Sequence, residues 1–286
     1  MSTPVISAVL GSYNRARFLR RTIASLRREL APHPHEIIVV DGGSTDGAIR
    51  WLCSQKDVVT IVQHNRGTWR GAPLPRRSWG WFMNLAFKAA HGRYVLMVSD
   101  DALLVPGSVD AALAHHGALT GEGRRVGALA FYWRDSFRKR PYIVGHSFGG
   151  KIFVNHGMYL REALEDVGYC DEDAYSFYHA DGDLCMRLWD RGWEVADAPR
   201  SFVEHFPHAT KAIRQGNLAR ADEDWATFCR RWKPDDGSTT GAITSPHVDT
   251  SRTALRFPAR DIAALYARRA ISRLRRLAAT RRAPHA

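Results

Sequence analysis

Two adjacent aspartates, Asp100 and Asp101, end a hydrophobic run in the segment VLMVSDDALLVPG, residues 95–107. Neighbouring carboxylates repel each other, so their charge must be compensated where the buried run ends. A solvated turn with a helix cap is one explanation. A divalent cation is the other, because carboxylate oxygens at a strand end suit Mg²⁺ or Mn²⁺, with substrate phosphates as further ligands.

Polar side chains also follow the other hydrophobic runs of the N-terminal half. Short apolar runs at residues 5–10, 36–40, 58–65 and 93–98 alternate with helix-like segments. This alternation predicts an α/β protein with a mostly parallel sheet, whose ligands bind beyond the carboxyl ends of the strands. Helix caps and turns could explain each of these polar residues singly. They do not explain why polar residues recur at the ends of four hydrophobic runs. The residues at these ends are Ser12, Tyr13, Asn14, Asp41, Asn65, Asp100 and Asp101.

The pattern changes after residue 121. We expect a strand at 126–133, a short helix at 161–168 and a helix at 181–191, followed by two final strands and a helix over 217–232. The Gly/Ser/Thr-rich segment 234–250 predicts a linker. Residues 251–286 predict a basic helical tail. The predicted domains are therefore 1–233, divided near 120, and the tail.

Bulk composition narrows the function classes. The net charge of +12 and the pI near 10.0 suit a polyanion, an anionic membrane surface or a phosphorylated substrate. Ten arginines but a single acid, Asp261, occur from Arg252 onward. No apolar run approaches the roughly 18 residues of a membrane span, and the first residues do not resemble a signal peptide. Four separated cysteines favour reduced thiols, so we expect a cytoplasmic protein.

Two glycine-rich signatures of phosphate binding are missing. No G-x-x-x-x-G-K-[ST] loop occurs, which argues against a P-loop nucleotidase. No G-x-G-x-x-G follows the first strand, which argues against a dinucleotide enzyme.

Several motifs, in order, resemble those of glycosyltransferase family 2. They are SAVLGSYNRARFLRRTIASL, EIIVVDGGSTDG, HNRG, NLAFKAAHGRYVLMVSDDALLVPGSVDAAL, LREALEDVGYCDED and HADGDLCMRLWDRGWEV. The resemblance covers about residues 4–208. It implies a GT-A fold, Rossmann-like with a mixed, mostly parallel sheet flanked by helices. It also implies inverting transfer from a nucleoside-diphosphate sugar to a hydroxyl acceptor.

The resemblance assigns donor-binding roles. Ser12, Tyr13 and Arg15 would line the nucleotide base, and Asp41 would hydrogen-bond the base or ribose. Asn65, in the N-x-G turn, joins this donor-binding set. The loop at 67–83 is longer and more basic than the family's, and its arginines could hold the diphosphate because guanidinium forks match phosphate geometry. These arginines are Arg70, Arg76 and Arg77. Of the three, we predict Arg77 as the donor-binding residue.

The resemblance also assigns the metal and the base. Asp101 would bind the cation and Asp100 the ribose or the cation. His205 would complete the metal site, with His208 as a competing ligand. A cation there would neutralise the departing diphosphate as a Lewis acid. Asp181 would be the general base for the attacking hydroxyl, and a single carboxylate without an opposing nucleophile implies inversion.

The environment of the base and two departures from the family pattern leave questions open. Asp181 would begin a helix, where the dipole favours the ionised carboxylate, whereas hydrophobic neighbours would raise its pKa. We interpret Asp183 as a helix-start residue that shapes the site, and not as a base. Ser99 stands where the family has an acid that binds metal, and Ala180 stands where it has a glutamate beside the base.

Two alternatives to a glycosyltransferase remain. One is a sugar-phosphate nucleotidyltransferase, although GSYNRARF lacks the usual Gly-rich loop. The other is a catalytically degenerate nucleotide-sugar-binding module, which Ser99 and Ala180 motivate. The basic tail could dock the protein on an anionic inner membrane surface or be a solubilising face. We expect no nucleic-acid partner.

Overall fold

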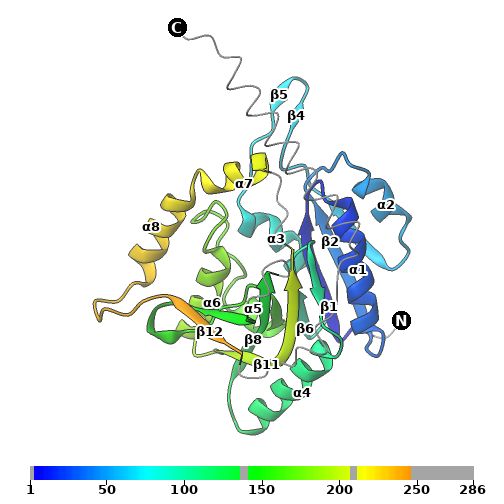
Figure 1. The fold of residues 1–286 in the computed structure, drawn as a ribbon. Helices are drawn as coiled ribbons and strands as arrows, with labels where there is room; N and C mark the ends of the chain where they lie inside the picture. The colour runs from blue at the N-terminus through cyan, green and yellow to red at the C-terminus, as the bar shows by residue number, and fades with distance from the viewer. Residues whose placement is uncertain (1–2, 136–140, 207–210, 246–286) are drawn as a thin grey trace. The chain divides into compact units, whose positions relative to one another are not determined.

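The computed structural model describes residues 3–135, 141–206 and 211–245. Its N-terminal half alternates strands and helices (Figure 1). The strands β1, β2, β3 and β6 lie side by side and parallel, because β1 pairs with both β2 and β6. Their carboxyl ends therefore meet at one edge, as predicted. The elements are β1 (Ile6–Ser12), α1 (Ala16–Leu30), β2 (His35–Asp41), α2 (Ala48–Ser54), β3 (Val58–Val62), α3 (Trp79–Lys88), β6 (Tyr94–Met97), β7 (Ala102–Leu104) and α4 (Ser108–Gly121).

The C-terminal half extends this sheet with antiparallel pairs. β10 joins β6 to β8, and β9 and β12 follow beyond β8. β11 lies parallel to β8 and also pairs with β7. The mixed α/β sheet is thus confirmed. The elements are β8 (Val126–Asp135), β9 (Ile143–His146), β10 (Gly157–Leu160), α5 (Arg161–Asp166), α6 (Ala180–Asp190), β11 (Glu194–His205), α7 (Lys211–Leu218), α8 (Ala221–Trp232) and β12 (Gly241–Thr244).

Helices cover both faces of the sheet, so the strand side chains are buried on both sides. Ala8 and Leu10 of β1 pack in one cluster with residues of α1, α2 and α4. Val9, which points to the opposite face, packs with residues of α3, α5 and α6. Burial on both faces explains why these strands are continuous hydrophobic runs without polar alternation.

Three details of the C-terminal half differ from the sequence prediction. The two final strands are one strand, β11, with an irregularity between Ala198 and Phe202. The helix expected at 217–232 is two helices, α7 and α8. Part of the segment predicted as a linker forms β12, which pairs with β9 and so belongs to the sheet. Backbone pairing between distant segments determines the extent of β11 and the presence of β12. Local periodicity in the sequence does not reveal such pairing.

The long basic loop between β3 and α3 contains a small hairpin, β4 (Thr68–Trp69) and β5 (Ala72–Pro73). Its two turn residues, Arg70 and Gly71, both have positive φ, which is typical of a type I′ hairpin turn. Among the described residues, no helix is both long and apolar enough to cross a bilayer. The predicted tail at 251–286 and His208 lie outside the described residues.

Candidate functional site

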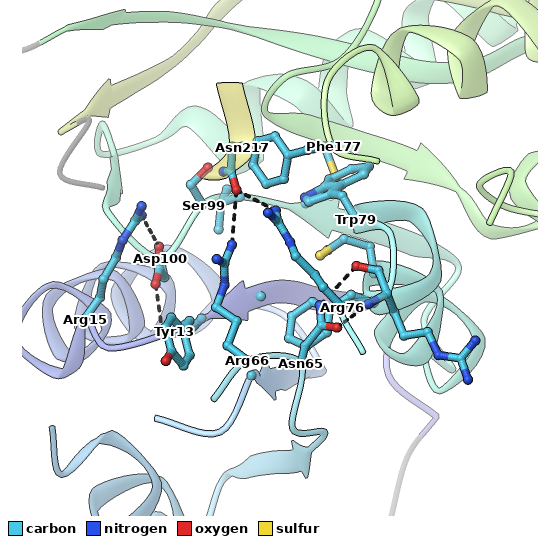
Figure 2. Close-up of a pocket in the computed structure, with 18 of the residues that line it drawn as sticks. Tyr13, Arg15, Asn65, Arg66, Arg76, Trp79, Ser99, Asp100, Phe177 and Asn217 are labelled. Carbon is cyan, nitrogen blue, oxygen red and sulfur yellow. Dashed lines mark hydrogen bonds and ion pairs between the residues drawn. The ribbon is translucent and has the colours of Figure 1, made fainter. Parts of the chain in front are cut away.

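An open pocket with a cavity volume of about 190 Å³ lies at the carboxyl edge of the parallel strands (Figure 2). Residues that follow β1, β3 and β6 line it, together with the start of α3 and one residue of α7. The sequence predicted six of its lining residues as donor-binding. These are Ser12, Tyr13, Arg15, Asn65, Arg77 and Asp100.

Arg15 compensates the adjacent aspartates. Its Nη1 lies 2.7 Å from Asp100 Oδ1 and 2.8 Å from Asp101 Oδ2, and Ser12 Oγ donates to Asp100 Oδ2 at 2.7 Å. Burial raises the pKa of Asp100 to about 6, although Arg15 opposes the shift. Burial would lower the pKa of Arg15, but the two carboxylates raise it above its ordinary value. The guanidinium therefore stays charged between the two acids, an arrangement that strand register alone did not indicate.

Asp41 holds the turn after β2. Its Oδ1 accepts from the backbone N–H groups of Gly43 and Ser44, at 2.9 and 2.6 Å. Gly43 has a φ of +91°, and a Cβ there would lie 2.5 Å from the His64 ring, so the turn requires glycine. Asp41 is fully buried, and its Oδ2 has no hydrogen-bond partner among the described residues. Asp41 itself does not line the pocket, but the next residue, Gly42, does.

Ser44 and Thr45 bind the turn after β1. Ser44 Oγ accepts from Asn14 N–H at 2.8 Å, and Asn14 Oδ1 accepts from Thr45 N–H at 2.7 Å. These bonds join the turns after β1 and β2. The residue before α2 is Gly47, in the left-handed conformation, and it makes no side-chain cap bond.

Asp101 and His205 come together from segments far apart in the sequence. His205 ends β11, whose pairing with β7 brings its Nε2 to 3.3 Å from Asp101 Oδ1. Its Nδ1 lies 3.6 Å from Asp135 Oδ1. Burial would lower the pKa of His205, but the Asp101 and Asp135 carboxylates raise it to about 9.

Asp181 lies in the first turn of α6. Its Oδ1 accepts from Gly182 N–H, and its Oδ2 accepts from the Asn155 amide at 3.0 Å. Asn155 lines the pocket, so it links Asp181 to that space. Burial raises the pKa of the Asp181 carboxyl, although these hydrogen bonds and nearby His179 favour the ionised form. Burial therefore prevails over the local hydrogen bonds.

Asp183, two residues further on, is fully buried in a different environment. Its carboxylate accepts from the Tyr175 hydroxyl and the Trp232 indole, and it pairs with Arg187 and Arg231. The contacts with Tyr175, Arg231 and Trp232 link α6 to neighbouring segments, whereas Arg187 lies in α6 itself. The interpretation of Asp183 as a residue that shapes the site stays a prediction.

The basic loop enters the pocket through part of its length only. Asn65 fixes its two ends, because Asn65 Oδ1 accepts from Arg77 N–H at 2.6 Å and its amide donates to the Arg77 carbonyl. Arg76 and Arg77 line the pocket, as the sequence suggested. Arg70 does not line it and lies over the exposed Trp69 ring at the hairpin turn.

Sequence reasoning missed Arg66, Asn155 and Asn217, which all line the pocket. Arg66 stands within the quoted HNRG motif, so its basic charge was a usable signal. Asn155 and Asn217 come from irregular or distant segments and carry no local pattern. Trp79, the first residue of α3, also lines the pocket.

Residues 7–121 match the family model described as Glycosyl transferase family 2. This part of the chain, less than half of its length, is similar to glycosyltransferases of that family. The match ends with α4, so it covers the residues that supply the parallel strands and the aspartate pair. The segment that supplies Asp181 and His205 lies beyond it.

A solved glycosyltransferase structure shares the fold. The mannosyltransferase PcManGT from Pyrobaculum calidifontis, in complex with GDP-Man and Mn2+, is 18% identical with a TM-score of 0.54, over 82% of this chain and 66% of that chain. TarS 1–349 from S. aureus, in complex with UDP-GlcNAc, is 16% identical with a TM-score of 0.49, over 73% and 60%. This chain thus spans less than two thirds of either neighbour. A search of curated protein sequences finds no significant match.

Proposed function

We propose that this protein transfers a sugar from a nucleoside-diphosphate sugar to a hydroxyl acceptor, with inversion at the sugar carbon. The observation that carries the proposal is the pocket at the carboxyl edge, lined by six residues that the family resemblance assigns to the donor. The mannosyltransferase of similar fold was solved with GDP-Man, a donor of this class.

The donor half, residues 1–120, would hold the nucleotide. The unpartnered Oδ2 of Asp41 is suited to accept an N–H of a base that enters past the pocket-lining residues Tyr13 and Gly42. A buried carboxylate oxygen without a donor is costly, so a ligand that supplies one gains affinity. Asp100 would hydrogen-bond the ribose, with Arg77 and Asn65 near the rest of the donor.

The donor atoms of Asp101 and His205 fit a divalent cation. A carboxylate oxygen and an imidazole nitrogen that lie 3.3 Å apart can both bind one ion at roughly 2.1 Å. The described residues offer no cluster of three His, Cys, Asp or Glu side chains, so donor phosphates and water would supply the other ligands. Bound Mg²⁺ or Mn²⁺ would neutralise the charge of the departing diphosphate. The mannosyltransferase complex contains Mn2+.

Asp181 would accept the proton of the acceptor hydroxyl. A carboxylate with a raised pKa is a stronger base while it is still ionised near neutral pH. Asn155 would orient it toward the pocket. Residues 121–233 would thus form the acceptor half of one catalytic domain.

A donor screen tests this proposal. Purified protein is incubated with UDP-, GDP- and dTDP-sugars, acceptor mixtures and Mn²⁺ or Mg²⁺, and released nucleoside diphosphate is measured. We expect release with one nucleotide class, which EDTA suppresses, and an inverted linkage by NMR. Tight nucleotide binding by isothermal titration without turnover of any donor would instead favour the degenerate binding module. Release of pyrophosphate from a nucleoside triphosphate and a sugar phosphate would favour the nucleotidyltransferase.

A further inference from the structure

Two guanidinium groups converge on one neutral oxygen at the wall of the pocket. Arg66 Nη2 donates to Asn217 Oδ1 at 3.1 Å, and Arg76 Nη2 donates to the same oxygen (Figure 2). Arg76 Nη1 also donates to the Gly216 carbonyl at 3.2 Å. Gly216 and Asn217 belong to the last turn of α7, so the partial negative charge of a helix carboxyl end faces both cations.

The described residues balance the positive charge of this pair only in part, because Asp224 raises the pKa of Arg76 without forming an ion pair with it. Neither Arg66 nor Arg76 forms an ion pair with a described carboxylate, and the amide oxygen and the helix end supply only partial charge. Burial lowers the pKa of both guanidinium groups, and each arginine also repels a neighbouring one. Two cations that share one neutral acceptor, with Arg66 partly buried and Arg76 exposed, favour an anionic ligand.

The ligand that fits is a diphosphate. Both arginines line the same pocket as Tyr13 and Asp100, so an anion at the pair would lie within the space proposed for the donor. We propose that Arg66 and Arg76 bind the two phosphates of the donor, and that Asn217 is a positioning residue that holds the two guanidiniums together. This inference rests on the proposed function for the identity of the donor. The binding of a diphosphate by the two arginines does not depend on it.

The charge of the pair makes Asn217 a sharp test. Asn217→Asp keeps the size of the side chain but adds a carboxylate that neutralises the arginines. Arg66→Ala and Arg76→Ala each remove one cation. Arg70→Ala is the matched control, because Arg70 lies in the same loop but does not line the pocket.

Isothermal titration of the full chain in EDTA with inorganic pyrophosphate measures the pair without the metal or the base. We expect the Kd for pyrophosphate to rise about 10- to 100-fold in Arg66→Ala, Arg76→Ala and Asn217→Asp, and to stay within about twofold in Arg70→Ala. Inorganic phosphate should bind more weakly than pyrophosphate. Binding of uridine or guanosine, which carry no phosphate, should be unchanged in all variants, which a merely structural role of Asn217 would not predict.

Three results would each overturn the inference. The first is no pyrophosphate binding by the wild type, and the second is equal pyrophosphate affinity of the wild type and the arginine variants. The third is equal affinity of the wild type for phosphate and pyrophosphate, which would indicate a single-phosphate site. Failure of the proposed function is distinct. If the pair binds pyrophosphate but no nucleoside diphosphate binds more tightly and no donor is turned over, the diphosphate site stands and the glycosyltransferase proposal fails.

Discussion

The two halves of the sheet supply the site in different ways. In the parallel half, register alone aligns the polar ends, because Ser12 at the end of β1 pairs with Asp41 at the end of β2. In the other half, Asp181 lies in a helix that begins after His179, whose φ is +65°, and Asn155 reaches it from an irregular segment. Repeated βα units thus place the donor edge by local rules, whereas the proposed acceptor side depends on contacts particular to this chain.

The largest expected effect is the loss of turnover in a variant of Asp181, which should leave nucleotide binding by the parallel half intact. Asp181→Asn should lower kcat by about 10²- to 10⁴-fold, because the amide cannot accept the hydroxyl proton. The Kd for nucleoside diphosphate should stay near that of the wild type, because donor contacts lie in the parallel half. Single-turnover kinetics and isothermal titration measure the two quantities. Near-normal turnover would contradict the assignment of the base.

The neighbouring aspartate should give the opposite result. Asp183→Asn should lower the free energy of unfolding by about 3 kcal/mol, because Arg187 and Arg231 would lose their buried carboxylate. Urea denaturation measures the loss, with Asp181→Asn as the matched control on the same helix. If Asp181→Asn destabilises the protein more than Asp183→Asn does, the two roles are reversed.

The pH dependence of turnover should report the buried base. Asp181 accepts a proton only when ionised, so kcat falls as pH falls through its pKa. Burial raises that pKa, so the acid limb should lie above the ordinary aspartate value of about 3.9. Asn155→Ala removes a hydrogen bond that favours the ionised form and should move the limb upward by about one pH unit. An unchanged or lower limb in this variant would contradict the proposed link.

The smallest effect on chemistry concerns the basic tail, which we propose as a membrane-docking segment. Removing residues 252–286 should leave turnover of a water-soluble acceptor within about twofold but reduce sedimentation with vesicles rich in anionic lipid. A full-length variant with the tail arginines changed to glutamine should behave likewise. Equal sedimentation of the wild type and both variants would contradict membrane docking.

The sequence predicted much of the donor edge and less of the rest. The strands at residues 5–10, 36–40 and 93–98 were predicted because each is a hydrophobic run interrupted by turn residues. The pairing of Asp101 with His205 was anticipated only through the family resemblance. β12 and the single long β11 were not predicted, because their partners lie far away in the sequence.

The sequence by itself determined the alternation of strands and helices and the polar residues at the strand ends, since both follow from short-range periodicity and turn chemistry. Only the tertiary structure decided that Arg15 lies between Asp100 and Asp101, and that Arg66 and Arg76 share Asn217. These contacts join residues about 85 and 150 positions apart in the sequence. No local pattern encodes such distances, because packing of the whole sheet and its helices sets which side chains meet.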